Sequence, residues 1–169
     1  MGEKEQRGSA SVGVGSAITG QELGSVGGEL DLSGMGDYAK TCGGPGLREL
    51  NFHDRARMLK AVALHLKLHR KALYQLSFET GATLADSKID IDGGIATLLV
   101  YASKGRREMP EDFILPDGEL ELLSRDGSFL GQHVYTPLRG VAVQINAFNF
   151  PVWGMLEKLA PSLLAGVPS

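Results

Sequence analysis

The order of the expected elements predicts an α/β fold with an appended antiparallel piece. Two long stretches with apolar residues at helical spacing come first, at 52–80 and 83–106. A predicted β-hairpin follows at 119–136, and then a continuously apolar run at 140–145, typical of a strand buried on both faces of a parallel sheet. A last helix is expected at 151–165. This alternation of helices and strands defines the class.

The composition of the 169 residues fits one globular domain and argues against several kinds of function. The chain is 43% hydrophobic, and its net charge is −3. A slightly acidic chain is a poor candidate for binding nucleic acid, and no apolar run reaches the roughly 18 residues that a membrane-spanning helix needs. The charged N-terminus lacks the apolar core of a secretory signal, and the single cysteine cannot form an internal disulfide. We therefore expect a cytoplasmic protein.

The region before the first long helix is rich in glycine and predicts little regular structure. Residues 1–17 combine small and charged side chains without periodicity, so we expect a flexible arm there. A Thr-Gly turn and two apolar residues predict a short edge strand within 18–26. A short helix is expected at 31–42, although two internal glycines weaken it, and the Gly-Gly-Pro-Gly run at 43–46 should end it.

The two long helices carry their own start and stop signals. Asn51, three residues before Asp54, resembles a capping box, and Gly81 is a natural C-terminal glycine. Gly93-Gly94 interrupts the second pattern, but the apolar spacing resumes in register, so we expect an unbroken helix. The expected apolar stripes are Leu59, Val62, Ala63, Leu66, Leu73 and Leu76 in the first helix, and Leu84, Ile91, Ile95, Leu98 and Ala102 in the second.

The C-terminal part changes from helical to strand periodicity. The hairpin is expected to have strands at 119–125 and 128–136, joined by an Asp-Gly turn. The apolar run lies within a buried strand expected at 138–147. Pro151 opens the final helix at its first turn, and Gly166 ends it.

The polar loop after the expected buried strand is the most informative candidate site. Ligands in open α/β sheets bind beyond the carboxyl ends of the strands, and residues 146–150 occupy that place. The side-chain amide of Asn149 could donate to a developing oxyanion. The alternative is a loop asparagine that satisfies its own backbone, and the residues alone favour that alternative.

Several separated segments resemble the aldehyde dehydrogenase superfamily. The resemblance is carried by Asn149-Phe150-Pro151 and by the run from Lys158 to Gly166. With ETGATLADS, DIDGG and YASKGRRE upstream, it is closer still to bacterial enzymes that oxidise CoA-linked semialdehydes in aromatic degradation, in the phenylacetate and benzoyl-CoA (box) pathways. The resemblance covers about 19–167 and implies a small-molecule aldehyde substrate, possibly CoA-linked, oxidised to the acid.

For the fold, the resemblance implies the N-terminal part of an aldehyde dehydrogenase-like structure, truncated after the first strand and helix of a Rossmann-like sheet. Residues 18–118 would be the helical part of the cofactor-binding domain, and 119–138 the hairpin of the oligomerisation subdomain. Residues 139–169 would begin the sheet. Full-length members use this hairpin to assemble, so the resemblance also implies a homo-oligomer.

The resemblance also implies roles for individual residues. Asn149 corresponds to the oxyanion-hole asparagine that binds the substrate oxygen. Lys158 matches a family lysine sometimes assigned to proton relay, with a surface or structural lysine as the alternative. The loop that lines the ribose and nicotinamide of NAD or NADP would consist of Ile145, Asn146, Ala147 and Phe148.

Two groups that the family mechanism needs have no match in this chain: the cysteine nucleophile and the glutamate base. Cys42 precedes a glycine-rich turn and is read as an ordinary small residue. We therefore expect a fragment of an NAD(P)-dependent aldehyde dehydrogenase that is inactive alone. The alternative is an inactive assembly module that pairs with a full-length homologue, because an exposed hairpin edge invites pairing.

Two further patterns favour structural roles over ligand binding. His65 and His69 have the spacing of zinc ligands on a helix, but no third ligand is nearby, so we expect no metal site. His69 is expected on or near the apolar stripe. The basic cluster in 104–107 is typical of a helix C-terminus with favourable cations.

Overall fold

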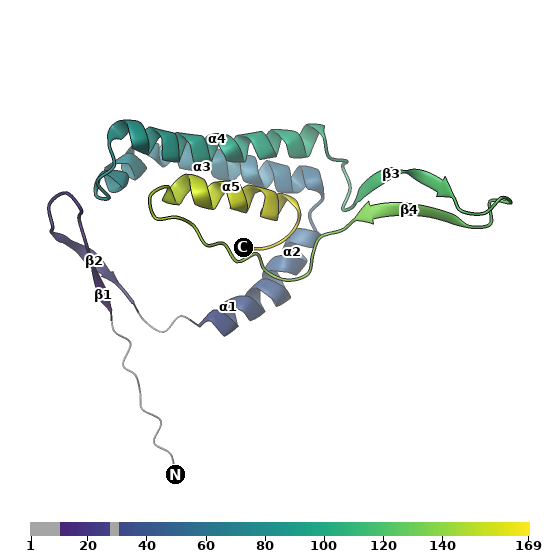
Figure 1. The fold of residues 1–169 in the computed structure, drawn as a ribbon, viewed down its shortest axis with the longest axis horizontal. Helices are drawn as coiled ribbons and strands as arrows, with labels where there is room; N and C mark the ends of the chain where they lie inside the picture. Colours follow the sequence, from purple (N-terminus) through teal and green to yellow (C-terminus); the bar gives the residue numbers. More distant parts are fainter. Residues whose placement is uncertain (1–10, 28–30) are drawn as a thin grey trace, which may run out of the picture.

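A layer of three helices forms the centre of the molecule, and two small hairpins project from it (Figure 1). The computed structural model describes residues 11–27 and 31–169. No helix in these ranges is long and apolar enough to cross a bilayer. The elements in order are β1 (Val12–Gly15), β2 (Glu22–Val26), α1 (Leu32–Tyr38), the π-helical η1 (Ala39–Gly43), α2 (Gly44–Arg48), α3 (Phe52–Phe78), α4 (Leu84–Arg107), β3 (Leu115–Leu122), β4 (Leu130–Tyr135) and α5 (Pro151–Leu164).

Local capping signals set the ends of the two long helices, and those of α3 are the ones that the sequence predicted. The Asn51 side chain accepts from the backbone N–H of Asp54 at 2.8 Å, and Gly81 follows α3 with φ of +86°. α4 begins with a full capping box between Thr83 and Asp86. Basic residues occupy the last turn of α4, as expected, and Lys104 pairs with Glu108 at 3.0 Å.

The three long helices bury one common apolar core. α3 and α4 run antiparallel, and α5 lies against both (Figure 1). The buried apolar residues are Phe52, Ala56, Leu59 and Ala63 from α3, Ile91, Ile95, Leu98 and Ala102 from α4, and Leu156, Ala160 and Leu164 from α5. The predicted stripes are correct in part, because Val62, Leu76 and Leu84 are exposed.

Glycines on α4 let α5 pack against its backbone. A Cβ added at Gly105 would lie 2.6 Å from Leu164 Cδ1, and one added at Gly93 would lie 2.6 Å from the Trp153 ring. At Gly94 it would lie 3.0 Å from Trp153 Cα. α4 is unbroken at Gly93-Gly94, as predicted, and the missing side chains make room for α5.

The N-terminal region has more regular structure than the sequence predicted. The expected flexible arm at 1–17 lies outside the described residues up to position 10, but Val12–Gly15 forms β1 and pairs antiparallel with β2. The predicted edge strand within 18–26 is therefore present, as β2. The hairpin is tied to the end of α3, because Ala17 donates its backbone N–H to the Glu79 carbonyl at 2.8 Å.

The predicted stop at 43–46 was wrong. The chain turns through η1 and continues as α2 across the Gly-Gly-Pro-Gly run. Proline is tolerated in the first turn of a helix, where its missing N–H would have no intrahelical partner. Pro45 has this place in α2.

The hairpin of β3 and β4 begins earlier than predicted and projects from the helical layer (Figure 1). Leu115 pairs with Tyr135, and Leu122 pairs with Leu130. Asp126 and Gly127 lie in the turn, with Gly127 at φ of +71°, but β3 ends at Leu122 and β4 begins at Leu130, so the connection is longer than the two residues predicted. Pro116 lies inside β3, where a two-stranded sheet offers the edge position that proline requires.

The buried strand expected at 138–147 is not formed, and this is the largest correction to the predicted fold. The segment has no regular structure, and Val143 and Ile145 are 83% and 90% exposed. Ala142 N–H donates to the Pro168 carbonyl at 2.8 Å, and Gln144 bonds Ser169 at 2.9 Å. An apolar strand is buried on both faces only between other strands and covering helices, and no described strand flanks this one.

Candidate active site

The loop before α5 opens onto a shallow pocket of about 280 Å³. Three residues predicted from the sequence meet there: Ala147, Asn149 and Lys158. Asn149 is exposed, so its amide is accessible to a small molecule. The other lining residues come from the loop end and the first two turns of α5, and they are Phe150, Trp153, Gly154 and Glu157.

The start of α5 is capped by a carboxylate from a different helix. The N-cap residue Phe150 offers no side-chain hydrogen bond. Asp90 of α4 is only 4% exposed, and its carboxylate accepts from the N–H groups of Val152 at 3.2 Å and Trp153 at 2.7 Å. It thus satisfies two N–H groups that have no partner within the helix. Sequence reasoning missed this role, and no local signal indicates it, because the two N–H groups lie 62 and 63 residues away in the sequence.

The other end of α5 is held by a buried cation. Arg55 of α3 is fully buried and donates to the carbonyls of Leu164 at 2.8 Å and Leu50 at 3.0 Å. Its guanidinium lies 4.7 Å from the centre of the Phe52 ring. Burial lowers the pKa of Arg55 from its ordinary value. An arginine stays charged in proteins, and so Arg55 complements the negative end of the α5 dipole.

Lys158 faces the pocket but is tied to its own helix. Its Nζ donates to the Gly154 carbonyl at 2.9 Å and lies 3.2 Å from Glu157 Oε1. Its side chain is 42% exposed, so the ammonium is accessible to solvent from the pocket. Both readings of Lys158, as a charged group of a site and as a helix-surface lysine, agree with this position.

Three residues of the predicted cofactor loop are exposed, and the fourth, Asn146, is half-buried. Ile145 and Phe148 are 90% and 93% exposed and offer apolar surface to a flat ring. Asn146 is turned toward α5, where a Cβ added at Gly154 would lie 3.7 Å from its Oδ1. That oxygen is buried without a hydrogen-bond partner in the described part of the chain. The Asn146 side chain thus lies toward α5, whereas Ile145, Ala147 and Phe148 are exposed.

The other reactive residues lie outside this pocket. Cys42 is exposed on η1, with Sγ 3.7 Å from Thr41 Oγ1, and does not line the pocket. His65 and His69 are both exposed, with ring centres 4.6 Å apart. His69 lies between Leu66 and Leu73, which pack against the common core, but its own side chain is exposed. Residues 11–27 and 31–169 contain no group of three metal-ligating side chains.

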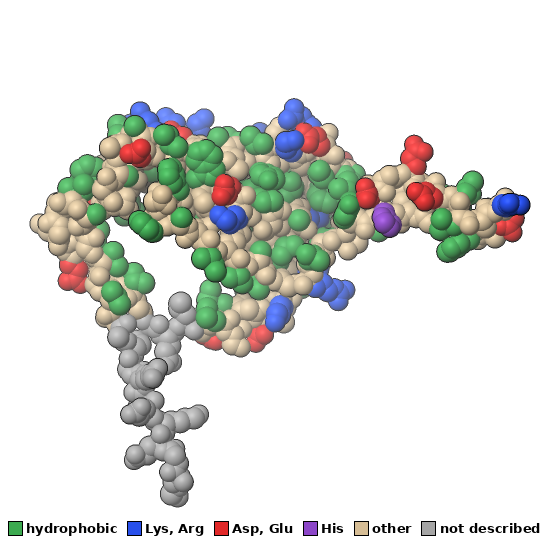
Figure 2. Space-filling model, viewed as in Figure 1, with side chains coloured by type: hydrophobic (Ala, Val, Ile, Leu, Met, Phe, Trp, Pro, Cys, Tyr) green, Lys and Arg blue, Asp and Glu red, His purple; other side chains and the backbone are tan. Residues whose placement is uncertain are grey.

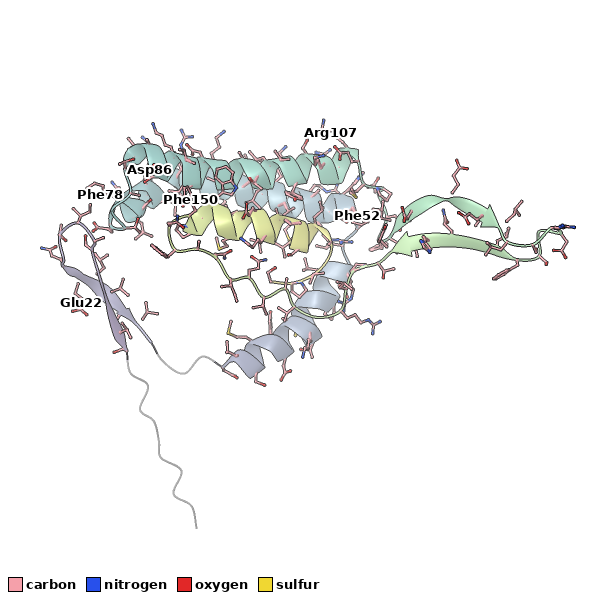
Figure 3. The ribbon with its side chains drawn as sticks, viewed as in Figure 1. Glu22, Phe52, Phe78, Asp86, Arg107 and Phe150 are labelled. Atoms are coloured by element: carbon pink, nitrogen blue, oxygen red, sulfur yellow. The ribbon has the colours of Figure 1, made fainter. Side chains whose placement is uncertain are left out.

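The start of α5 lies at the same end of the helical layer as the α3–α4 turn. In Figure 3, Phe150 lies at this end, with Phe78 and Asp86, whereas Phe52 and Arg107 mark the opposite end. The Asn149-Phe150-Pro151 loop, which carries part of the resemblance to aldehyde dehydrogenases, opens α5 at this end of the layer. The chain belongs to the aldehyde dehydrogenase family, whose family model matches residues 12–168.

Two known proteins give the relationship more detail. The chain is 41% identical over 153 residues to a 3,4-dehydroadipyl-CoA semialdehyde dehydrogenase of Aromatoleum evansii. The aligned region covers 89% of this chain and 30% of the relative. It also matches the crystal structure of an NADP dependent enzyme of E. coli, with a TM-score of 0.71 and 23% identity, over 94% of this chain and 31% of that one. The chain thus spans about a third of the length of these proteins.

Proposed function

We propose that this chain is the part of an NAD(P)-dependent aldehyde dehydrogenase that supplies the oxyanion donor. The substrate would be a CoA-linked semialdehyde from the degradation of aromatic compounds, oxidised to the acid in the cytoplasm. The observation that carries the proposal is the exposed Asn149 amide on the pocket at the start of α5. The similarity to the A. evansii enzyme supports the class of substrate.

The proposed chemistry uses Asn149 when the carbonyl oxygen gains charge. In the complete enzyme a cysteine thiolate, which the described pocket does not contain, would attack the aldehyde carbon, so that a C–S bond forms and the C=O electron pair moves to oxygen. The Asn149 N–H donates to that oxyanion, and the nearby Lys158 ammonium adds a positive charge to the same pocket. When bound, NAD(P)⁺ would supply the hydride acceptor for the oxidation, and hydrolysis would then give the acid and the free thiol.

The residues around the pocket also have proposed roles. Ile145, Ala147 and Phe148 would contact the nicotinamide half of the cofactor. We do not assign the nucleophile to Cys42, because it lies on η1 and is not a pocket residue.

A chimera tests the function. This chain would replace the matching stretch of the A. evansii enzyme, and NADP and NAD reduction would be measured with a CoA-linked semialdehyde. We expect turnover with the CoA-linked substrate that exceeds turnover with the free semialdehyde. A chimera that assembles and melts like the parent enzyme, yet reduces neither nucleotide, would contradict the proposal.

The second candidate function is that of an assembly module, and the exposed hairpin of β3 and β4 favours it. Leu120, Leu122, Phe129 and Leu130 of this hairpin are 47–72% exposed, and both of its strands have an open edge. Size-exclusion chromatography of the chain with the A. evansii enzyme tests this candidate. Co-elution supports it, and separate elution over the assay's concentration range removes it.

A further inference from the structure

We propose that Asp90 is a positioning residue for the Asn149 oxyanion donor. The inference rests on the function proposed above and deepens it. Asp90 does not line the pocket. It acts through the backbone of α5, by fixing where that helix begins.

The first step concerns the N–H groups at the start of α5. An α-helix leaves its first N–H groups without intrahelical partners. Phe150 provides no side-chain cap for α5. The Asp90 carboxylate binds the second and third residues of the helix instead, with its two oxygens on two different N–H groups. A bidentate, buried acceptor determines both the position and the direction of the helix start.

The second step concerns the lateral position of the same turn. Trp153, which donates its N–H to Asp90 at 2.7 Å, lies over the bare backbone of Gly93 and Gly94. α4 therefore contacts the first turn of α5 through a charge and through a close backbone approach. The first turn of α5 has little freedom to shift along or away from α4.

The third step links the helix start to the amide. Asn149 precedes Val152 by three residues, and Pro151 between them has a restricted φ. A displacement of Val152 and Trp153 is thus transmitted to Asn149 across two residues. Because oxyanion stabilisation depends on donor placement within a few tenths of an ångström, a loosened helix start would slow the chemical step more than substrate binding.

α4 offers a matched control two residues away. Asp92 is also an aspartate of α4, but it accepts from the Tyr74 hydroxyl of α3 at 2.7 Å. Asp92→Ala therefore removes a hydrogen-bonded carboxylate from the same helix, as Asp90→Ala does, but the partner that loses its acceptor belongs to α3 and not to α5.

The first test uses the full 169-residue chain and NMR. Asp90→Ala should raise the exchange rates of the Val152 and Trp153 amides by about tenfold or more and shift the Asn149 side-chain amide signals. Asp92→Ala should change neither. If Asp90→Ala does not fold, Asp90→Asn, which keeps one acceptor oxygen, is compared with Asp92→Asn by the same two readouts. Unchanged amides in the folded Asp90 variant, or equal changes in the matched Asp92 variant, would overturn the proposal.

The second test uses the chimera and separates this inference from the proposed function. Asp90→Ala should lower kcat roughly 10- to 100-fold, with KM for the CoA-linked substrate nearly unchanged, and Asp90→Asn should recover part of the loss. If Asn149→Ala lowers kcat and Asp90→Ala does not, the positioning role is wrong. In a third outcome, Asn149→Ala leaves kcat unchanged, while Asp90→Ala still speeds exchange of the Val152 and Trp153 amides. The proposed oxyanion role of Asn149 is then wrong, and Asp90 positions a helix start but no catalytic donor.

Discussion

Two buried charges with opposite signs hold the ends of α5. Asp90 lies at the N-terminus, where the helix dipole is positive, and Arg55 lies at the C-terminus, where it is negative. A buried charge is costly unless it is hydrogen-bonded. Asp90 accepts from two free N–H groups at the start of α5, and Arg55 donates to the Leu164 carbonyl at its end and to the Leu50 carbonyl before α3. Each charge thus compensates a helix end that would otherwise be unsatisfied.

Replacing Arg55 should destabilise the fold substantially. Arg55→Met would leave the carbonyls of Leu164 and Leu50 without their donor, and we expect a loss of about 2–4 kcal/mol in the free energy of unfolding. The control is Arg57→Met, because the pair of Arg57 with Asp54 is half-exposed and is worth at most about 1 kcal/mol. Urea unfolding measures both. Equal losses in the two variants would refute the role of the buried arginine.

The turn of the second hairpin should respond to acid. Hydrogen bonds from the Ser124 and Ser128 hydroxyls and the Ser128 N–H lower the pKa of Asp126 from 3.8 to about 2. The stabilisation of the turn is therefore complete above pH 3.8 and is lost as the pH falls through about 2. An NMR titration of the Asp126 carboxyl carbon checks this value. A midpoint near 4, the same as in an unfolded peptide, would show that these hydrogen bonds are absent.

At the scale of elements, the sequence predicted the helix ends that neighbouring residues determine, but not the features that depend on distant segments. Asn51 and Gly81 fix the ends of α3 through neighbours in the chain, so both ends were predictable. The segment at 138–147 was not, because its apolar pattern describes a strand only when other strands flank it. The glycines of α4 were seen as interruptions, but their function depends on α5, about 60 residues further along the chain.

The candidate site shows the same division. Asn149 and Lys158 were found through their motif, and the structure brings both to one pocket. Asp90 could not be assigned, because its partners on α5 lie 62 and 63 residues away in the sequence. The orientation of Asn146 toward Gly154 is likewise a tertiary contact with no sequence signal.

The close packing of α4 and α5 predicts a cost for one added methyl group. Gly105→Ala would place a Cβ 2.6 Å from Leu164 Cδ1 and 3.0 Å from Ala56 Cβ, so we expect a loss of about 1–3 kcal/mol. Gly36→Ala in α1 is the control. Nothing lies within 4 Å there, and alanine should stabilise that helix by up to about 1 kcal/mol. Thermal unfolding of both variants measures these changes in stability. A more stable Gly105→Ala variant would mean that α5 lies further from α4 than described.

At the scale of the whole molecule, a packed helical layer carries an uncovered apolar segment. Leu138, Val143, Ile145 and Phe148 are 76–93% exposed, and Figure 2 shows further apolar side chains spread over the helical face and the hairpin. Contiguous exposed apolar surface marks places where another protein surface binds. The chain spans 30% of the length of its A. evansii relative, and full-length relatives have more chain with which to cover such surface.

Amide hydrogen exchange should distinguish the packed helices from the exposed apolar segment. We expect the amides of α3, α4 and α5 that surround the common core to exchange slowly, because opening them requires disrupting buried contacts. Amides in 138–148 should exchange at nearly unprotected rates, except Ala142, which donates to Pro168. In the chimera the same segment should gain protection as it is covered. Protection of 138–148 in the isolated chain equal to that of the helices would contradict the described structure.

The central claim is that Asn149 donates to the substrate oxygen during oxidation of a CoA-linked semialdehyde. The most direct measurement is kcat of the chimera with Asn149→Ala, because removal of one oxyanion donor typically costs about 10²- to 10³-fold. We predict a loss of that size with KM little changed, whereas Cys42→Ser should retain the parental rate. An Asn149→Ala chimera that turns over the substrate as fast as its parent would contradict the account.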